Sequence, residues 1–177
     1  MSDRPSNKPQ MAASAFRLPA LDRDFLLGDS TRGLRFQMEY QKAEESLRSL
    51  QIESTIVVFG SARVKEGDAS GWYESARAFA KLSSEQSGAK LNNKTARYNV
   101  IATGGGPGIM EAANRGAYDA DAKSIGYNIT LPMEQEPNPF STPELTFRFH
   151  YFAMRKMHFA MRAAALVVFP GGFGTLD

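Results

Sequence analysis

Short apolar runs that each stop at a glycine-rich turn constrain this chain more than any other feature of its sequence. Residues 98–103 lead directly into GGGPG, and residues 165–169 lead into PGGFGT. Residues 55–59 (TIVVF) end at Gly60 in the same way. Short, mostly apolar runs of this kind are typical of strands that are buried on both faces of a sheet. We therefore expect a central sheet with glycine turns at the ends of these strands.

Segments of helical character alternate with the strands. Helices are predicted at 31–50, 72–86, 109–120 and 152–163, further strands at 124–131 and 145–151, and loops at 88–96 and 132–143. Apolar side chains recur every three to four positions in the first two helices, and the third is rich in alanine. Strands that alternate with helices predict an α/β fold with a parallel, right-handed doubly wound sheet. Such sheets bind ligands in a crevice at the carboxyl ends of their strands.

The N-terminal residues have a different character. Pro5, Pro9 and Pro19 stand among Ser, Asn and Asp, and no apolar run is long enough for a signal sequence. We predict a loose arm over residues 1–30 and a single domain over residues 31–177. Charged residues or proline interrupt every apolar stretch before it reaches the roughly 18 residues of a membrane span, so we expect no membrane partner.

The amino-acid composition excludes several classes of catalytic and binding site. The 177 residues include no cysteine, which excludes thiol nucleophiles, thiolate metal sites and redox motifs. The same feature is compatible with a reducing compartment, and we expect a cytoplasmic protein. The formal net charge of +2 is too small for a nucleic-acid-binding surface, and a small anionic substrate fits better than a polyanion. His150 and His158 have no metal-ligand partners at recognisable spacing, so we predict no metal site.

The glycine turns have the composition of an anion site. Glycine lets the backbone approach a ligand, and the N–H groups at a helix start favour phosphate, although a single such loop is as often a plain tight turn. Because both turns follow strands of one parallel sheet, we expect them to face one crevice and bind a phosphate or phosphoester. The candidate residues are Gly104, Gly105, Gly106, Gly171, Gly172, Gly174 and Thr175. Ser61 and Arg63 are further candidates, with capping or solvation of their turn as the alternative role.

Two common nucleotide motifs are missing. No GKS or GKT follows the glycines, which argues against a P-loop NTPase. Ile109 stands where the dinucleotide-binding fingerprint that begins at Gly104 would need its third glycine, and the turn at residues 60–63 lacks the fingerprint as well. NAD is therefore only a third choice of ligand.

The motifs resemble those of the LOG family of nucleotide-specific phosphoribohydrolases, whose members long carried a lysine decarboxylase label. The resemblance rests on TGGGPGIMEAANRGA at residues 103–117, on PGGFGT at residues 170–175, and on the pair Arg155-Lys156 in the preceding helix. FGSAR at residues 59–63 resembles the family's first turn, and NPF at residues 138–140 is similar to its larger bacterial members. This family resemblance implies a Rossmann-like, three-layer αβα fold. It also implies hydrolysis of AMP or a cytokinin riboside monophosphate to free base and ribose 5-phosphate.

The chemistry of such a hydrolysis needs a cation and a carboxylate, which assigns expected roles to individual residues. Arg155 is expected to orient the substrate and stabilise the leaving group or the phosphate, with a plain surface cation as the alternative, and Lys156 is a weaker candidate for binding. Glu111 is expected to orient the ribose or the loop, and a carboxylate that simply favours the helix dipole is the alternative. The family further implies a homodimer with sites near the interface, and no cofactor.

One part of the family pattern is absent. In PGGxGTxxE the glutamate falls at the position after Asp177, where the sequence ends. Asp177 itself is one residue too early, and on a helix it would point about 100° away. We therefore expect that the C-terminal part of the domain, with its catalytic carboxylate, is missing and that the chain as given binds nucleotide weakly and hydrolyses it poorly.

One other function remains open on the sequence alone, and a second is disfavoured. A nucleotide- or molybdenum-cofactor-binding carrier would use the same phosphate site without hydrolysis. A pyridoxal-phosphate decarboxylase would need a Schiff-base lysine with partners for the cofactor's ring and phosphate, and nothing around Lys156 supplies them. The preferred base of the nucleotide is not fixed by these motifs.

Overall fold

The computed structural model describes residues 5–90, 96–130 and 136–176, and the chain divides into two compact units, Met1–Met38 and Glu39–Asp177. The first unit contains the short helices α1 (Lys8–Ala12) and α2 (Arg23–Leu27), the 3₁₀ turns Ser14–Phe16, Pro19–Leu21 and Asp29–Thr31, and the start of α3 (Arg32–Ser49). Arg35 donates hydrogen bonds to the carbonyl oxygens of Leu26 and Gly28, which fixes the turn between α2 and α3. The arm boundary at residue 30 stays a prediction.

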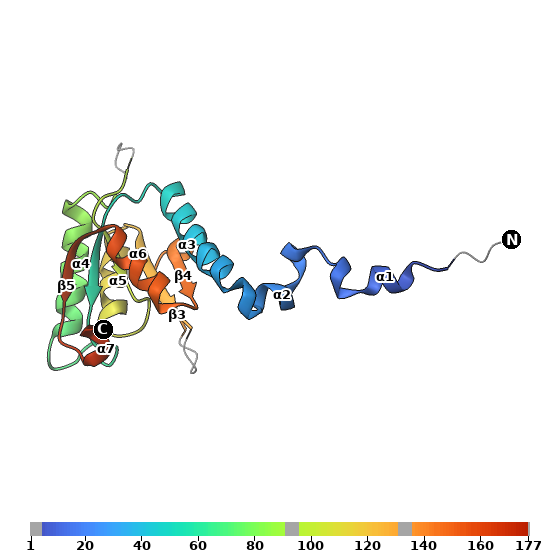
Figure 1. Cartoon of the computed structure of the whole chain (residues 1–177). Helices are drawn as coiled ribbons and strands as arrows, with labels where there is room; N and C mark the ends of the chain where they lie inside the picture. Colours follow the sequence, from blue (N-terminus) through green and yellow to red (C-terminus); the bar gives the residue numbers. More distant parts are fainter. Residues whose placement is uncertain (1–4, 91–95, 131–135, 177) are drawn as a thin grey trace. The chain divides into compact units, whose positions relative to one another are not determined.

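The second unit is built on a five-stranded sheet (Figure 1). Its strands are β1 (Thr55–Phe59), β2 (Val100–Thr103), β3 (Ser124–Ile129), β4 (Thr146–Phe149) and β5 (Ala163–Val168). All neighbouring strands are parallel, in the order β4-β3-β2-β1-β5. The predicted parallel α/β sheet is thus confirmed. The chain moves outward from β1 to β4 and then returns to the other side of β1, so the order reverses between β1 and β5. Such a reversal opens a crevice at the carboxyl ends of the two strands.

Helices cover both faces of the sheet. On one face α4 (Trp72–Gln86) and α5 (Ile109–Asp119) pack on Val58 and Ile101. On the other face α3 and α6 (Phe152–Met161) pack on Val57 and Tyr127. Successive residues of a strand point to opposite faces, which is why adjacent valines of β1 belong to different cores. The three-layer αβα arrangement is confirmed. Across the described residues, none of the helices has both the length and the apolar character that a membrane crossing needs.

The predicted bounds of helices and strands agree best with the structure where they depend only on neighbouring residues in the sequence. β1 and α4 have the predicted bounds, whereas β2 begins two residues late because Asn99 adopts a left-handed conformation with φ of 56°. β4 ends at Phe149 because the next two backbone N–H groups donate to the Glu39 carboxylate instead of continuing the ladder. Residues 91–95 and 131–135, which fall within the predicted loops and the end of the third predicted strand, lie outside the described residues.

A buried ion pair connects three elements on the α3 side of the sheet. The guanidinium of Arg162, directly after α6, donates two hydrogen bonds of 2.8 Å to the Glu44 carboxylate of α3. Its Nε also donates to the carbonyl oxygen of Ile52, just before β1. These hydrogen bonds hold the pKa of Glu44 down to about 2, against the opposing effect of burial.

Candidate functional site

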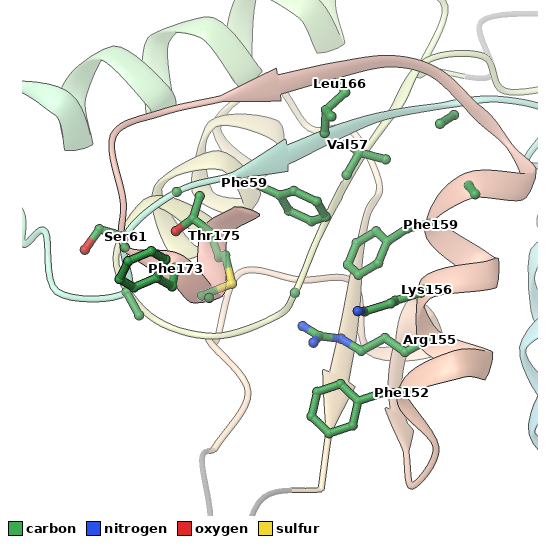
Figure 2. Close-up of a pocket in the computed structure, with 18 of the residues that line it drawn as sticks. Val57, Phe59, Ser61, Phe152, Arg155, Lys156, Phe159, Leu166, Phe173 and Thr175 are labelled. Carbon is green, nitrogen blue, oxygen red and sulfur yellow. The ribbon is translucent and has the colours of Figure 1, made fainter. Parts of the chain in front are cut away.

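A pocket of about 890 Å³ opens at the carboxyl ends of β1 and β5, where the strand order reverses. It is bounded by the turn after β1, the start of the GGGPG loop, one side of α6 and the PGGFGT turn (Figure 2). The pocket therefore lies at the predicted crevice. Six of its lining side chains are large and apolar, and sequence analysis did not assign them to the site: Phe59, Met110, Phe152, Phe159, Leu166 and Phe173. Their residue types indicate only core packing, so no sequence pattern identifies them as a pocket wall.

Arg155 is the central polar group of the pocket. Its Nε donates a 2.7 Å hydrogen bond to the carbonyl oxygen of Tyr127, and its guanidinium carbon lies 5.4 Å from the centre of the Phe159 ring. Figure 2 shows the side chain pointing from α6 into the pocket beside Lys156, between Phe152 and Phe159. Burial lowers the pKa of the guanidinium below its ordinary value. Among the described residues no carboxylate pairs with Arg155, so this cation favours an anionic ligand.

Gly104 is the part of the GGGPG loop that reaches the pocket. A Cβ atom on Gly104 would lie 2.5 Å from Nη2 of Arg155 and 2.8 Å from the sulfur of Met110. The glycine therefore makes room for the guanidinium at the pocket wall. Gly105 and Gly106, which were predicted to bind the same ligand, are not among the residues that line the pocket.

The turn after β1 is joined to both glycine-rich segments. The backbone N–H of Ser61 donates to the carbonyl oxygen of Pro170, and its carbonyl oxygen accepts from the N–H of Ile109. The Ser61 hydroxyl oxygen accepts from the N–H of Arg63, which is the capping role considered as the alternative. Ser61 and Arg63 nevertheless both line the pocket, and the hydroxyl hydrogen of Ser61 is not used in that bond.

The PGGFGT turn supplies a third side of the pocket. Gly172, Gly174 and Thr175 line it, whereas Gly171 does not. The Thr175 side chain packs directly against Gly171, leaving no space there for a Cβ atom. The turn leads into α7 (Phe173–Leu176). Asp177, the substitute considered for the family glutamate, lies outside the described residues.

Glu111 lies apart from this arrangement. Its Oε1 accepts a 2.8 Å hydrogen bond from the hydroxyl of Tyr73, a buried residue of α4. Glu111 does not line the pocket, so the structure does not bring it together with Arg155. Within the described ranges, no three His, Asp or Glu side chains are close enough together to hold a metal ion.

A comparison with models of known protein families finds a match that includes part of these motifs. Residues 110–177 match the family model described as "Possible lysine decarboxylase", the family of LOG-like proteins. This part of the chain is similar to that family. The matched region contains most of α5, the Arg155-Lys156 pair and the PGGFGT turn, whereas the turn after β1 lies outside it. No curated protein matches the chain significantly.

Proposed function

We propose that the protein binds a nucleoside 5′-monophosphate in this pocket and hydrolyses its N-glycosidic bond. The observation that carries the proposal is the half-buried guanidinium of Arg155, which no described carboxylate pairs and which lines one largely apolar pocket together with two glycine-rich turns. A nucleotide combines the two features that such a pocket recognises, an anionic phosphate and a flat, largely apolar base. The family match supports a nucleotide-directed reaction.

In the proposed reaction the bond between the ribose C1′ and the base nitrogen breaks. Water adds its oxygen to C1′, and one proton ends on the leaving base, so the products are free base and ribose 5-phosphate. The transition state carries positive charge on the ribose and negative charge on the base. Arg155 would bind the phosphate or neutralise the leaving base, and Lys156 in the same pocket would add a second cation.

One observation favours a second candidate, a carrier that binds a nucleotide or a molybdenum cofactor without hydrolysis. None of the described residues that line the pocket is acidic. Hydrolysis of a glycosidic bond ordinarily uses a carboxylate to stabilise the ribosyl cation or to activate water. Binding alone requires only the cations and the backbone of the turns.

The test is to incubate the purified protein with AMP and to measure both binding by calorimetry and release of adenine by chromatography. We expect binding and adenine release, and Arg155→Ala should weaken AMP binding by about tenfold or more, which corresponds to about 1.4 kcal/mol. Lys65→Ala is the control because this exposed lysine does not line the pocket. Binding without adenine release would favour the carrier. No AMP binding by the unaltered protein would contradict both candidates.

A further inference from the structure

Four buried polar side chains form a network directly behind the GGGPG loop. Thr103, Asn114, Ser124 and Asn138 have exposed fractions of 0%, 0%, 1% and 6%. They come from the end of β2, the middle of α5, the start of β3 and the segment before β4. A buried polar group costs free energy unless it is hydrogen-bonded, so a network of four needs its bonds to be complete. We call these four residues the asparagine network.

Asn138 holds the loop from one side. Its backbone N–H donates to the carbonyl oxygen of Gly105 at 2.8 Å, and its Nδ2 donates to that of Gly106 at 3.1 Å. Its Oδ1 accepts from the N–H groups of Phe140 and Ser141, which fixes the orientation of the amide. Asn138 is thus attached to two consecutive peptide groups of the loop.

Asn114 completes the network. Its Oδ1 accepts from Nδ2 of Asn138 at 3.0 Å and from the Thr103 hydroxyl at 2.7 Å. Its Nδ2 donates to Ser124 Oγ and to the carbonyl oxygen of Ile125. The Thr103 oxygen in turn accepts from the N–H of Gly105 at 3.0 Å. Because both amides have donors and acceptors engaged, neither can rotate without losing bonds.

The network determines which part of the loop faces the pocket. The N–H and the carbonyl group of Gly105 and the carbonyl group of Gly106 are all bonded inward, and Gly105 takes a φ of 73°. Only Gly104 among the three glycines remains at the pocket wall, directly against Arg155. A loop released from the network would be free to move Gly104 toward the guanidinium.

We propose that Asn138 is a positioning residue for nucleotide binding, acting through the GGGPG loop on the place of Gly104 beside Arg155. This inference rests on the proposed function. It differs from a purely structural role in one measurable respect. A residue that only stabilises the fold changes the melting temperature and leaves the affinity of the folded protein unchanged, whereas a positioning residue changes the affinity.

Asn138→Asp is the most discriminating substitution. An ionised carboxylate keeps the shape and the Oδ1 acceptor but cannot donate to the Gly106 carbonyl, and it lies against two acceptor oxygens. Burial and these acceptors raise the pKa of the new carboxyl group. Protonation at lower pH restores one donated bond. We therefore expect the ratio of variant to unaltered Kd for AMP to be about tenfold near pH 8 and to decrease toward about pH 5.

The experiment measures AMP binding by calorimetry, well below the melting temperature, over this pH range for both proteins. A ratio within about twofold at every pH would overturn the proposal while leaving the proposed function intact. A ratio that stays high without any pH dependence would also overturn it, because the lost donor would then not be the cause. If the unaltered protein does not bind AMP, the proposed function itself fails.

A second pair of variants keeps the test decisive if Asn138→Asp does not fold. Thr103→Val keeps the shape but removes the oxygen that joins Gly105 to Asn114, and Thr103→Ser retains it. We expect Thr103→Val to weaken AMP binding by about tenfold and Thr103→Ser to restore it. Thr55→Val is the matched control, since its equally buried hydroxyl has no hydrogen-bond partner among the described residues and Thr55 does not line the pocket. Equal affinity of all three variants would overturn the proposal.

Discussion

At the scale of single residues, the pocket depends on a glycine that leaves space for an arginine. The motifs in the sequence identified both Gly104 and Arg155, because each belongs to a short local pattern. The same reasoning could not place Glu111, whose hydrogen-bond partner Tyr73 is 38 positions away on another helix. The motif shows that a carboxylate follows the glycines, but the direction of its side chain depends on a contact that only the folded chain reveals.

Gly104→Ala tests this arrangement. The added Cβ would meet the ends of two flexible side chains, Nη2 of Arg155 and the sulfur of Met110, rather than backbone. We expect the fold to adjust by moving the guanidinium, with a loss of AMP affinity of about tenfold and a melting temperature close to that of the unaltered protein. Gly33→Ala in α3 is the control because Gly33 does not line the pocket and no described atom lies within 4 Å of its added Cβ. Equal effects of the two substitutions on calorimetric binding would contradict the prediction.

At the scale of elements, the alternation of strands and helices was predictable, and most errors fall at the ends. Apolar periodicity and glycine turns depend on neighbouring residues, so they identify β1 and α4 directly. The end of β4 instead depends on the Glu39 carboxylate, more than 100 positions earlier in the chain. The packing of two helices against each other also depends on residues that are far apart in the sequence. Gly116 of α5 lies against the backbone of α4, a contact that its place in an alanine-rich helix does not indicate.

Gly116→Ala should therefore destabilise the fold. Its Cβ would lie 2.9 Å from the Ala80 Cβ and from the backbone nitrogen of Lys81, and it would also overlap the carbonyl oxygen of Arg77. Backbone atoms cannot move aside as the end of a flexible side chain can, so α4 and α5 must separate. We therefore expect the unfolding free energy to decrease by roughly 1–3 kcal/mol. Gly33→Ala in α3 is the matched helical control. No described atom lies within 4 Å of its added Cβ, so alanine should stabilise that helix by up to about 1 kcal/mol. Urea denaturation of both variants measures the difference, and equal signs would contradict this account.

At the scale of the whole molecule, the stability of the second unit should depend on pH through two buried groups on the α3 side of the sheet. His158 is 1% exposed, and the centre of its ring lies 5.6 Å from the centre of the Tyr40 ring and 5.4 Å from the centre of the Phe149 ring. Neither ring nitrogen has a hydrogen-bond partner among the described residues. Burial has the largest effect and lowers the pKa of His158, Arg162 acts in the same direction, and Glu44 and the backbone of Tyr40 act against it. Neither the burial of this histidine nor the Glu44–Arg162 pair was predictable, because their partners are distant in sequence.

Acid should therefore weaken the fold in two steps. The unfolded state binds a proton at His158 near pH 6.5, and the folded state, in which the pKa of His158 is lower, binds it less readily, so the unfolding free energy falls as the pH decreases below 6.5. The slope of this step is at most about 1.4 kcal/mol per pH unit. Glu44 adds a second loss, which begins near its ordinary pKa of 4.5 and continues toward about 2, as protonation breaks its bonds to Arg162. His158→Phe should abolish the upper step and keep the lower one, and His150→Gln, an exposed control, should keep both. Urea denaturation at a series of pH values checks this, and a persisting upper step in His158→Phe would show that another group causes it.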